Sequence, residues 1–224
     1  IDLRYNGGGY LAAAAHLCSS VAPLDIVNNE SRLITKRWNK KLQQFYTDNQ
    51  IMYQIEQNFD ETVDVKMGLN SIHFLIGPNS ASASELTITG LSPYMDVTTV
   101  GDTTHGKYTG SVTLTPDIFY DSESYYEGFE NWALQPIVFI YANSYGQTDF
   151  KDGFAPDILA QDDYTTALGT IEEPLFKAAV EHITGDPAIA MKSAKTIRRP
   201  FVINEIRSSR FDEYKSKLLD DFGP

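Results

Sequence analysis

Short apolar runs alternate along most of the chain with segments that have the spacing of a helix. Residues 1–4 have the pattern of the end of a buried strand, and they lead into the turn Gly7-Gly8-Gly9. A helix to about residue 22 is predicted next, because its apolar residues recur on one helix face. These residues are Leu11, Ala14, Ala15, Cys18 and Val21.

Later segments predict a mixed sequence of strands and helices. The apolar run 72–76 ends at Gly77-Pro78, which is typical of a central strand that enters a loop, and a helix through residue 91 follows. The last helix is predicted over 172–184, with Pro174 in its first turn and Gly185 just past its end. Further strands are predicted over 97–100, 108–114 and 136–141. Strands that alternate with helices indicate an α/β fold.

Three segments lack this regularity. Residues 24–68 have no clean periodicity, which favours a hairpin or lid-like insertion over a core layer, and residues 116–133 are acidic and aromatic, as in a surface loop. The charged segment 191–224 is interpreted as a peripheral C-terminal tail. Residues 1–190, which precede it, have the length of one domain. A basic cluster in the first of these segments is interpreted as a solvated face, with a substrate-binding rim as the alternative. It consists of Arg32, Lys36, Arg37, Lys40 and Lys41.

Composition narrows the function classes. The 224 residues are 42% hydrophobic and 21% charged, which is ordinary for a globular domain. A formal net charge of −12 argues against a nucleic-acid partner, because affinity for phosphates comes mainly from Lys and Arg. Cys18 is the sole cysteine and is expected in the core, and no apolar run is long enough for a transmembrane helix. His16, His73 and His182 lack metal-ligand spacing, so no metal is expected.

Serines lead into the helix that follows the strand 72–76. Ser80, Ser82 and Ser84 alternate with alanines directly before Glu85. The start of a helix presents backbone N–H groups and the positive end of the dipole, which would stabilise an oxyanion formed at Ser82. By themselves, serines at a helix start are more often N-caps than nucleophiles.

A lysine follows the next strand after a polar turn. The sequence Gly101-Asp102-Thr103-Thr104-His105-Gly106 ends at Lys107, which is 25 positions after Ser82. A lone lysine is normally a solvated surface charge. The pair gains meaning only when both segments are considered together.

Together, the two segments resemble the catalytic signature of the C-terminal processing (tail-specific) serine peptidases of family S41. In that family a SASE-type segment carries the nucleophile and a T-x-G-K segment carries the base, which correspond here to Ser82 and Lys107. Asp2-Leu3-Arg4-Tyr5-Asn6-Gly7-Gly8-Gly9 is similar to the family's D-L-R-x-N-x-G-G turn. Gly153-Phe154-Ala155-Pro156-Asp157 is similar to its G-x-x-P-D segment, so the resemblance covers roughly residues 1–185.

The resemblance implies a crotonase/ClpP-like α/β catalytic domain that hydrolyses peptide bonds through an acyl-enzyme, without a cofactor. The backbone amides of Ala83 and of Gly8 or Gly9 would bind the oxyanion. A lysine accepts a proton only when it is neutral, and free lysine titrates near 10.4. Lowering the pKa of a lysine toward neutrality by roughly 3 units corresponds to about 4 kcal/mol and requires burial of the amine. Lys107 is therefore expected to be largely buried.

The chain departs from the family pattern at two positions. Many members carry a glutamine four residues after the lysine, where this chain has Ser111. His105 replaces the usual aromatic residue, and on a strand it would point the same way as Lys107. The preferred interpretation is that His105 fills the aromatic slot, with a triad of Ser82, His105 and Asp102 as the less favoured alternative. Glu85 is either a supporting group at the site or an ordinary first-turn carboxylate.

Two other function classes remain open. A catalytically inactive peptide- or ligand-binding protein could use the same fold, and so could an acyl-CoA enzyme of the crotonase type. Polypeptides are the expected substrates of a peptidase of this family. The resemblance further implies a missing N-terminal part, a PDZ or other substrate-binding domain upstream, and a bacterial periplasmic or envelope location. A homo-oligomer, or association with the missing segment, is also expected, since unpaired strand edges aggregate.

Overall fold

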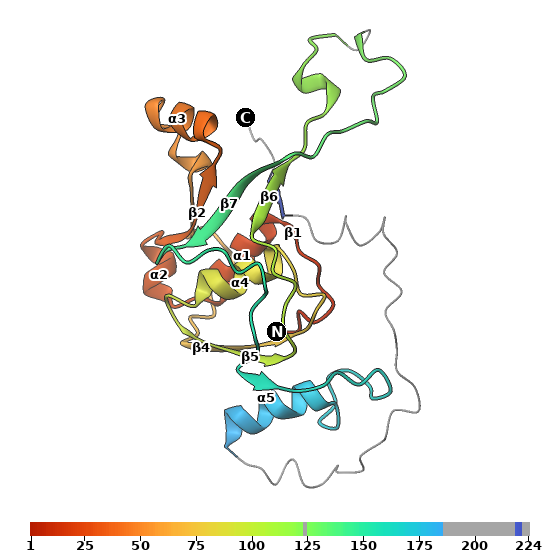
Figure 1. Cartoon of the computed structure of the whole chain (residues 1–224). Helices are drawn as coiled ribbons and strands as arrows, with labels where there is room; N and C mark the ends of the chain where they lie inside the picture. Colours follow the sequence, from red (N-terminus) through yellow and green to blue (C-terminus); the bar gives the residue numbers. More distant parts are fainter. Residues whose placement is uncertain (123–124, 186–217, 221–224) are drawn as a thin grey trace.

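Helices and strands alternate through the chain and form two sheets (Figure 1). The computed structural model describes residues 1–122 and 125–185 and the backbone of 218–220. The strands are β1 Gly9–Tyr10, β2 Arg32–Trp38, β3 Glu56–Asn58, β4 Ser71–Ile76, β5 Asp96–Gly101, β6 Thr109–Val112, β7 Ile137–Asn143, β8 Ile158–Leu159 and β9 Leu218–Asp220. The α-helices are α1 Leu11–Val21, α2 Leu24–Asn28, α3 Lys40–Asp48, α4 Ala83–Leu91 and α5 Pro174–Thr184, and 3-10 turns cover Met52–Gln54 and Pro116–Ile118.

The smaller sheet is parallel, with the order β4-β5-β8. Side chains alternate across β4: Phe74 and Ile76 enter the main core, whereas Leu75 packs against α5 on the opposite face. Such continuous apolar runs are typical of strands buried on both faces. The strand predicted over 72–76 is therefore confirmed.

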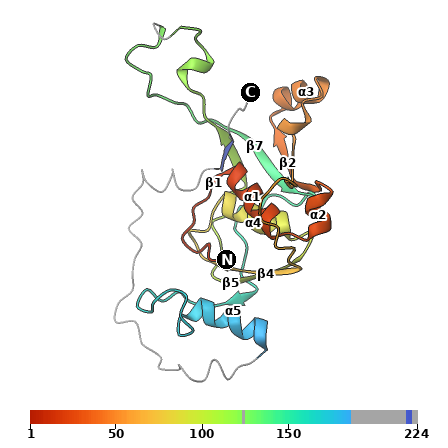
Figure 2. The ribbon, with the colours of Figure 1, turned by 180° about the vertical axis from the view of Figure 1, so that it is seen from behind.

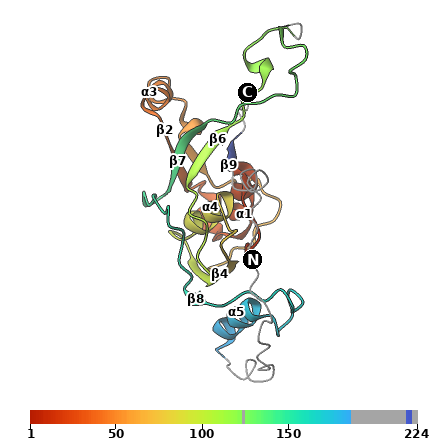
Figure 3. The same cartoon turned by 45° about the vertical axis from the view of Figure 1, so that its right-hand side comes forward.

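The larger sheet has the order β1-β9-β6-β7-β2-β3 and mixes parallel and antiparallel pairs. Helices α1 and α4 pack against each other between this sheet and β4-β5 (Figure 3). Helix α5 packs on the opposite side of β4 and β5 from α1 and α4, as the view from behind also shows (Figure 2). The predicted helix ending near residue 22, the helix reaching residue 91 and the one over 172–184 are all present, and Cys18 is fully buried in the main core.

The interpretation of residues 24–68 as an insertion rather than a core layer is wrong for β2. This strand pairs with β3 in a hairpin, but it also pairs with β7 inside the larger sheet, and Leu33 and Ile34 are fully buried. Lys36 is buried as well, which contradicts its assignment to a solvated face, whereas Arg32, Arg37, Lys40 and Lys41 are exposed. The strand was missed because Lys36 occupies one of its buried positions and interrupts the alternation of apolar and polar residues that indicates a strand.

Residues 116–122 and 125–133 belong to the predicted surface loop and extend away from the body beyond β6 and β7 (Figure 1). The predicted tail lies mostly outside the described residues. Its segment Leu218–Asp220 forms β9 between β1 and β6, so this part of the tail belongs to the larger sheet rather than to the periphery. None of the helices in the described ranges has the length and apolar character needed to cross a membrane.

Candidate active site

Ser82 occupies a strained and buried position immediately before α4. Its φ of +58° lies in the left-handed region that non-glycine residues rarely adopt. The side chain is fully buried, and its Oγ has no hydrogen-bond partner among residues 1–122 and 125–185. A buried hydroxyl without a partner is costly and uncommon, and together with backbone strain it is typical of functional positions.

Ser80 fixes the loop that leads to Ser82. Its hydroxyl donates to the carbonyl of Leu3 at 2.7 Å and accepts from the backbone N–H of Gly77 at 3.0 Å. The backbone N–H of His105 donates to the carbonyl of Ser80 at 3.0 Å. The first of the three serines thus anchors the loop, which lets the second adopt its strained backbone.

The carboxylate of Glu85 is the centre of a buried hydrogen-bond network. One oxygen accepts from the backbone N–H groups of Ser82 at 2.9 Å and Lys107 at 2.8 Å. The other oxygen accepts from the Thr104 hydroxyl and the Gly106 N–H, both at 2.6 Å. Glu85 thus joins the main chains of both predicted catalytic segments, and its bond from the Ser82 N–H is also one that an ordinary first-turn glutamate makes.

Tyr141 makes a second connection between these segments. Its ring is fully buried on β7, and its hydroxyl is 3.0 Å from the carbonyl of Ser82 and 3.2 Å from that of Lys107. A phenol has one proton, so the two carbonyls share a single donor. Tyr141 was not predicted as a site residue, because its partners lie 59 and 34 positions away in the sequence and no local motif records them.

Burial governs the electrostatics of both connecting groups. It raises the pKa of Glu85, although the hydrogen bonds from Thr104, Gly106, Lys107 and Ser82 act in the opposite direction. Burial, with a smaller effect from the nearby carboxylate, raises the pKa of Tyr141 well above its usual value. The tyrosine is therefore a neutral hydrogen-bond donor at ordinary pH.

Gly8 lies directly against the serine. A Cβ atom built on Gly8 would lie 2.7 Å from the Ser82 Cβ and 2.9 Å from the Ala83 nitrogen, and the φ of Gly8 is +101°. Only glycine permits this approach. The N–H of Gly8 donates to the Asn6 side chain at 2.9 Å, so its use as a predicted oxyanion donor requires Asn6 to turn away. Ala83 is the first residue of α4, where helical N–H groups lack an intrahelical acceptor.

The turn that carries Lys107 differs from the prediction in its backbone. Residues 103–108 are irregular, and Gly106 has a φ of +89°, so the argument that His105 and Lys107 alternate along a strand is wrong. Lys107 is partly buried, less than expected, and His105 and Asp102 are exposed. Ser111 is buried on β6.

The segment over 153–157 supports this turn from the opposite side. The backbone N–H of Phe154 donates to the Thr104 hydroxyl at 2.7 Å, and the N–H of Thr104 donates to the Phe154 carbonyl at 3.1 Å. Gly153 approaches so closely that a Cβ atom would lie 2.1 Å from the Thr104 carbonyl oxygen. Asp157 accepts from the N–H and the hydroxyl of Thr99 at 2.7 and 2.8 Å. The described residues contain no group of three potential metal ligands.

An α/β fold that presents a serine on a strained turn into a helix has the general arrangement used by nucleophilic hydrolases. Residues 1–160 match the model of peptidase family S41, and the chain belongs to this family. No curated protein sequence matches the chain.

Solved structures that align with a TM-score of 0.5 or more have a similar fold. A Bacteroides fragilis NCTC 9343 protein assigned to the S41 proteases aligns with a TM-score of 0.64 and 24% identity, over 82% of this chain and 44% of that chain. A lipoprotein from Streptococcus agalactiae aligns with a TM-score of 0.50 and 15% identity, over 82% and 53% of the two chains. The photosystem II D1 C-terminal processing protease has a TM-score of 0.47 and 17% identity, over 70% and 33%. The chain thus spans about half or less of the length of these relatives.

Proposed function

We propose that the chain carries the active site of a serine endopeptidase that hydrolyses polypeptides with a Ser-Lys dyad. The observation that supports this most strongly is the buried Ser82 Oγ, which has no hydrogen-bond partner within the described ranges, while its main chain is tied to that of Lys107. Two separate groups make this connection, the Glu85 carboxylate and the Tyr141 hydroxyl. Such rigid support is what a catalytic pair needs.

The proposed reaction proceeds in two stages. The Ser82 oxygen attacks the peptide carbonyl while the neutral Lys107 amine takes the hydroxyl proton, and the amides of Ala83 and of Gly8 or Gly9 bind the oxyanion. The lysine then returns the proton to the leaving amine, which leaves an acyl-enzyme on the serine. In the second stage the lysine accepts a proton from water as the water oxygen attacks the ester, and it returns this proton to the departing Ser82 oxygen, which restores the serine and the neutral amine. The step needs no cofactor.

A fluorophosphonate probe separates this proposal from a catalytically inactive binding protein on the same fold. We expect labelling of Ser82, detected as a mass increase on the peptide that contains it, and hydrolysis of a fluorogenic polypeptide. Ser82→Ala removes only the hydroxyl oxygen and should lower hydrolysis to below about 1% without loss of thermal stability. Exposed Ser92→Ala is the matched control. An unlabelled wild-type protein, or an active Ser82→Ala variant, would refute the proposal.

The remaining expectations concern context. Family membership and the Streptococcus agalactiae lipoprotein neighbour are compatible with a bacterial envelope location, which we propose for this protein. Self-association and association with an upstream segment stay predictions.

A further inference from the structure

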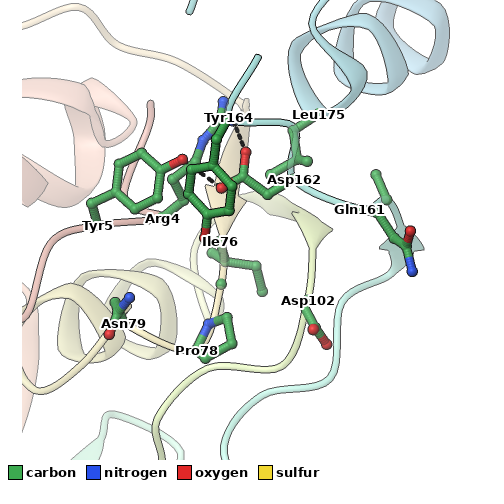
Figure 4. A pocket seen from close by; sticks show the side chains of 12 residues that line it. Arg4, Tyr5, Ile76, Pro78, Asn79, Asp102, Gln161, Asp162, Tyr164 and Leu175 are labelled. Atoms are coloured by element: carbon green, nitrogen blue, oxygen red, sulfur yellow. Dashed lines mark hydrogen bonds and ion pairs between the residues drawn. The ribbon is translucent and has the colours of Figure 1, made fainter. Parts of the chain in front are cut away.

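A cavity of about 200 Å³ opens at the carboxyl ends of the parallel strands β4, β5 and β8 (Figure 4). Ligands of α/β sheets commonly bind at this edge. Ile76 and Leu175 contribute apolar surface, and Tyr5 and Tyr164 form an aromatic wall with ring centroids 6.2 Å apart and planes inclined by 23°. Both rings are about half exposed, and the Arg4 guanidinium carbon lies 5.8 Å from the centroid of the Tyr5 ring.

The guanidinium of Arg4, which also lines the cavity, is already occupied by carboxylates. Its Nε lies 3.0 Å from Asp2, and its Nη1 lies 2.9 Å from Asp162 and 2.7 Å from the buried Glu173, which also accepts from Nη2 at 2.9 Å. Arg4 is itself fully buried. A bidentate, desolvated ion pair of this kind holds its donors in place. Arg4 is therefore poorly placed to attract an anion such as a substrate carboxylate.

Negative charge exceeds positive charge around the cavity. Asp162 receives the Tyr5 hydroxyl as well as Arg4, and Asp102 adds an exposed carboxylate whose Oδ1 accepts from the Thr103 N–H at 2.7 Å. Among the charged residues that line the cavity, two carboxylates, Asp102 and Asp162, stand against one guanidinium, and Arg4 is also paired with Asp2 and Glu173, which do not line the cavity. Aromatic faces beside carboxylates attract cations, and apolar walls suit an aliphatic stem.

The two chain segments that leave the cavity converge at the proposed nucleophile. Residues 77–79 line the cavity, and Ser82 follows three positions later on the loop fixed by Ser80. Tyr5 lines it from the other side and leads into Gly8, which contacts the Ser82 Cβ position. The cavity is therefore connected to the proposed nucleophile by two short main-chain segments.

We propose that this cavity is a subsite for a cationic side chain, lysine or arginine, of the polypeptide substrate. The inference rests on the proposed peptidase function. The aliphatic stem lies on the apolar and tyrosine surfaces, and the charged head lies between the carboxylates of Asp102 and Asp162.

The test uses neutral fluorogenic peptides in which a single lysine moves along the sequence, each paired with a norleucine peptide of the same length. At one position of the lysine, the lysine peptide should be cleaved with a kcat/KM about 5- to 20-fold higher than the paired norleucine peptide. The difference should lie mainly in KM. Asp102→Asn preserves the acceptor for Thr103 but removes the charge, so it should reduce this ratio about threefold or more. Asp121→Asn, on the distant exposed loop, is the matched control and should leave the ratio unchanged. Binding of the same peptides to Ser82→Ala protein gives a readout without catalysis.

The outcomes distinguish the two proposals. Hydrolysis with no lysine preference in any register would overturn the cationic subsite and leave the peptidase proposal intact. Equal loss of kcat on lysine and norleucine peptides in Asp102→Asn would also overturn it, because Asp102 would then serve the chemistry. If nothing is cleaved but lysine peptides bind more tightly than norleucine peptides in a manner that depends on Asp102, the subsite stands and the proposed function fails. Absence of both effects refutes both.

Discussion

Replacing Glu85 with glutamine tests whether one buried carboxylate holds the proposed catalytic pair together. The carboxylate accepts four hydrogen bonds, three from backbone N–H groups and one from the Thr104 hydroxyl. A glutamine has only one oxygen, so its NH₂ group must face two of these donors. The least costly orientation turns NH₂ toward Thr104, whose hydroxyl can rotate and accept, and toward the N–H of Gly106, which then has no acceptor.

The expected loss of stability follows from the number of hydrogen bonds that Glu85→Gln changes. An unsatisfied buried donor costs about 1–3 kcal/mol, and the other backbone bonds lose the strengthening that a charged acceptor provides. Removing a buried charge offsets part of the loss, because burial raises the pKa of Glu85. We expect a net loss of about 1–3 kcal/mol in the free energy of unfolding, or a Tm lower by about 2–12 °C for a chain of this size. Activity should fall by about 100-fold, because displacements near 1 Å have that effect.

The raised pKa also fixes the sign of a pH effect. The folded protein binds a proton at Glu85 more readily than the unfolded chain does, so this group stabilises the fold below the ordinary glutamate pKa of 4.5. That contribution is lost as the pH rises through the higher pKa of the folded state. Glu85→Gln should remove it, which denaturant unfolding at several pH values would detect.

Exposed Glu61→Gln is the matched control for the substitution. Steady-state hydrolysis and thermal unfolding of the two variants are compared with those of the wild type. If Glu85→Gln matched Glu61→Gln in both measurements, the carboxylate would not hold Ser82 and Lys107 in place, and the reasoning above would be refuted.

Four further substitutions test other contacts of the proposed site and of the ion pair at Arg4. Tyr141→Phe removes one shared hydrogen bond and should lower kcat about 10-fold with KM within about twofold in steady-state kinetics, whereas exposed Tyr145→Phe should leave both unchanged. Lys107→Ala should abolish peptide hydrolysis and His105→Phe should retain most of it; the reverse result in the same assay would favour a histidine base. Burial alone would raise the pKa of Glu173, but hydrogen bonds from the arginine side chain and two backbone N–H groups outweigh it and lower the pKa. The ionised carboxylate therefore adds stability above pH 4.5 that is lost as the pH falls, and Glu173→Gln should cost about 3–5 kcal/mol at pH 7 in denaturant unfolding, with a smaller cost in acid.

The sequence predicted those helices and strands whose signals lie within a short stretch of the chain. The apolar run at β4, the proline and glycine that bound α5, and the serine-rich start of α4 each carry their structural signal within about ten residues. β2 was missed as a core strand because its burial depends on pairing with β7, about a hundred residues later. Lys36 on β2 is buried within reach of the Trp38 and Phe139 rings, at 5.9 Å from each ring centroid, an environment that no local pattern reveals.

In the candidate site, too, local motifs identified some features, whereas others depend on contacts between distant segments. A motif resemblance identified Ser82, Glu85 and Lys107 as candidates, but it contained no information on how they are held. Tyr141 connects two carbonyls that are distant in sequence, and the irregular backbone at Gly106 sets the direction of the lysine turn. Both depend on tertiary contacts, so sequence reasoning could not derive them.

Three unfavourable features occur together at Ser82, and their coincidence is the strongest physical argument for function. The residue has a left-handed φ without being glycine, its buried Oγ has no hydrogen-bond partner in the described ranges, and a backbone approach that only glycine permits adjoins it. The strained backbone and the unpaired hydroxyl each cost about 1–3 kcal/mol, so a protein selected for stability alone would replace Ser82 with glycine. The surrounding carboxylate, tyrosine and serine bonds instead maintain the strained arrangement. Conflicts between local preference and fold are expected to concentrate where function requires them. Ser82→Gly should accordingly relieve the strain and the unpaired hydroxyl together, which makes a stability gain the natural counterpart of lost activity.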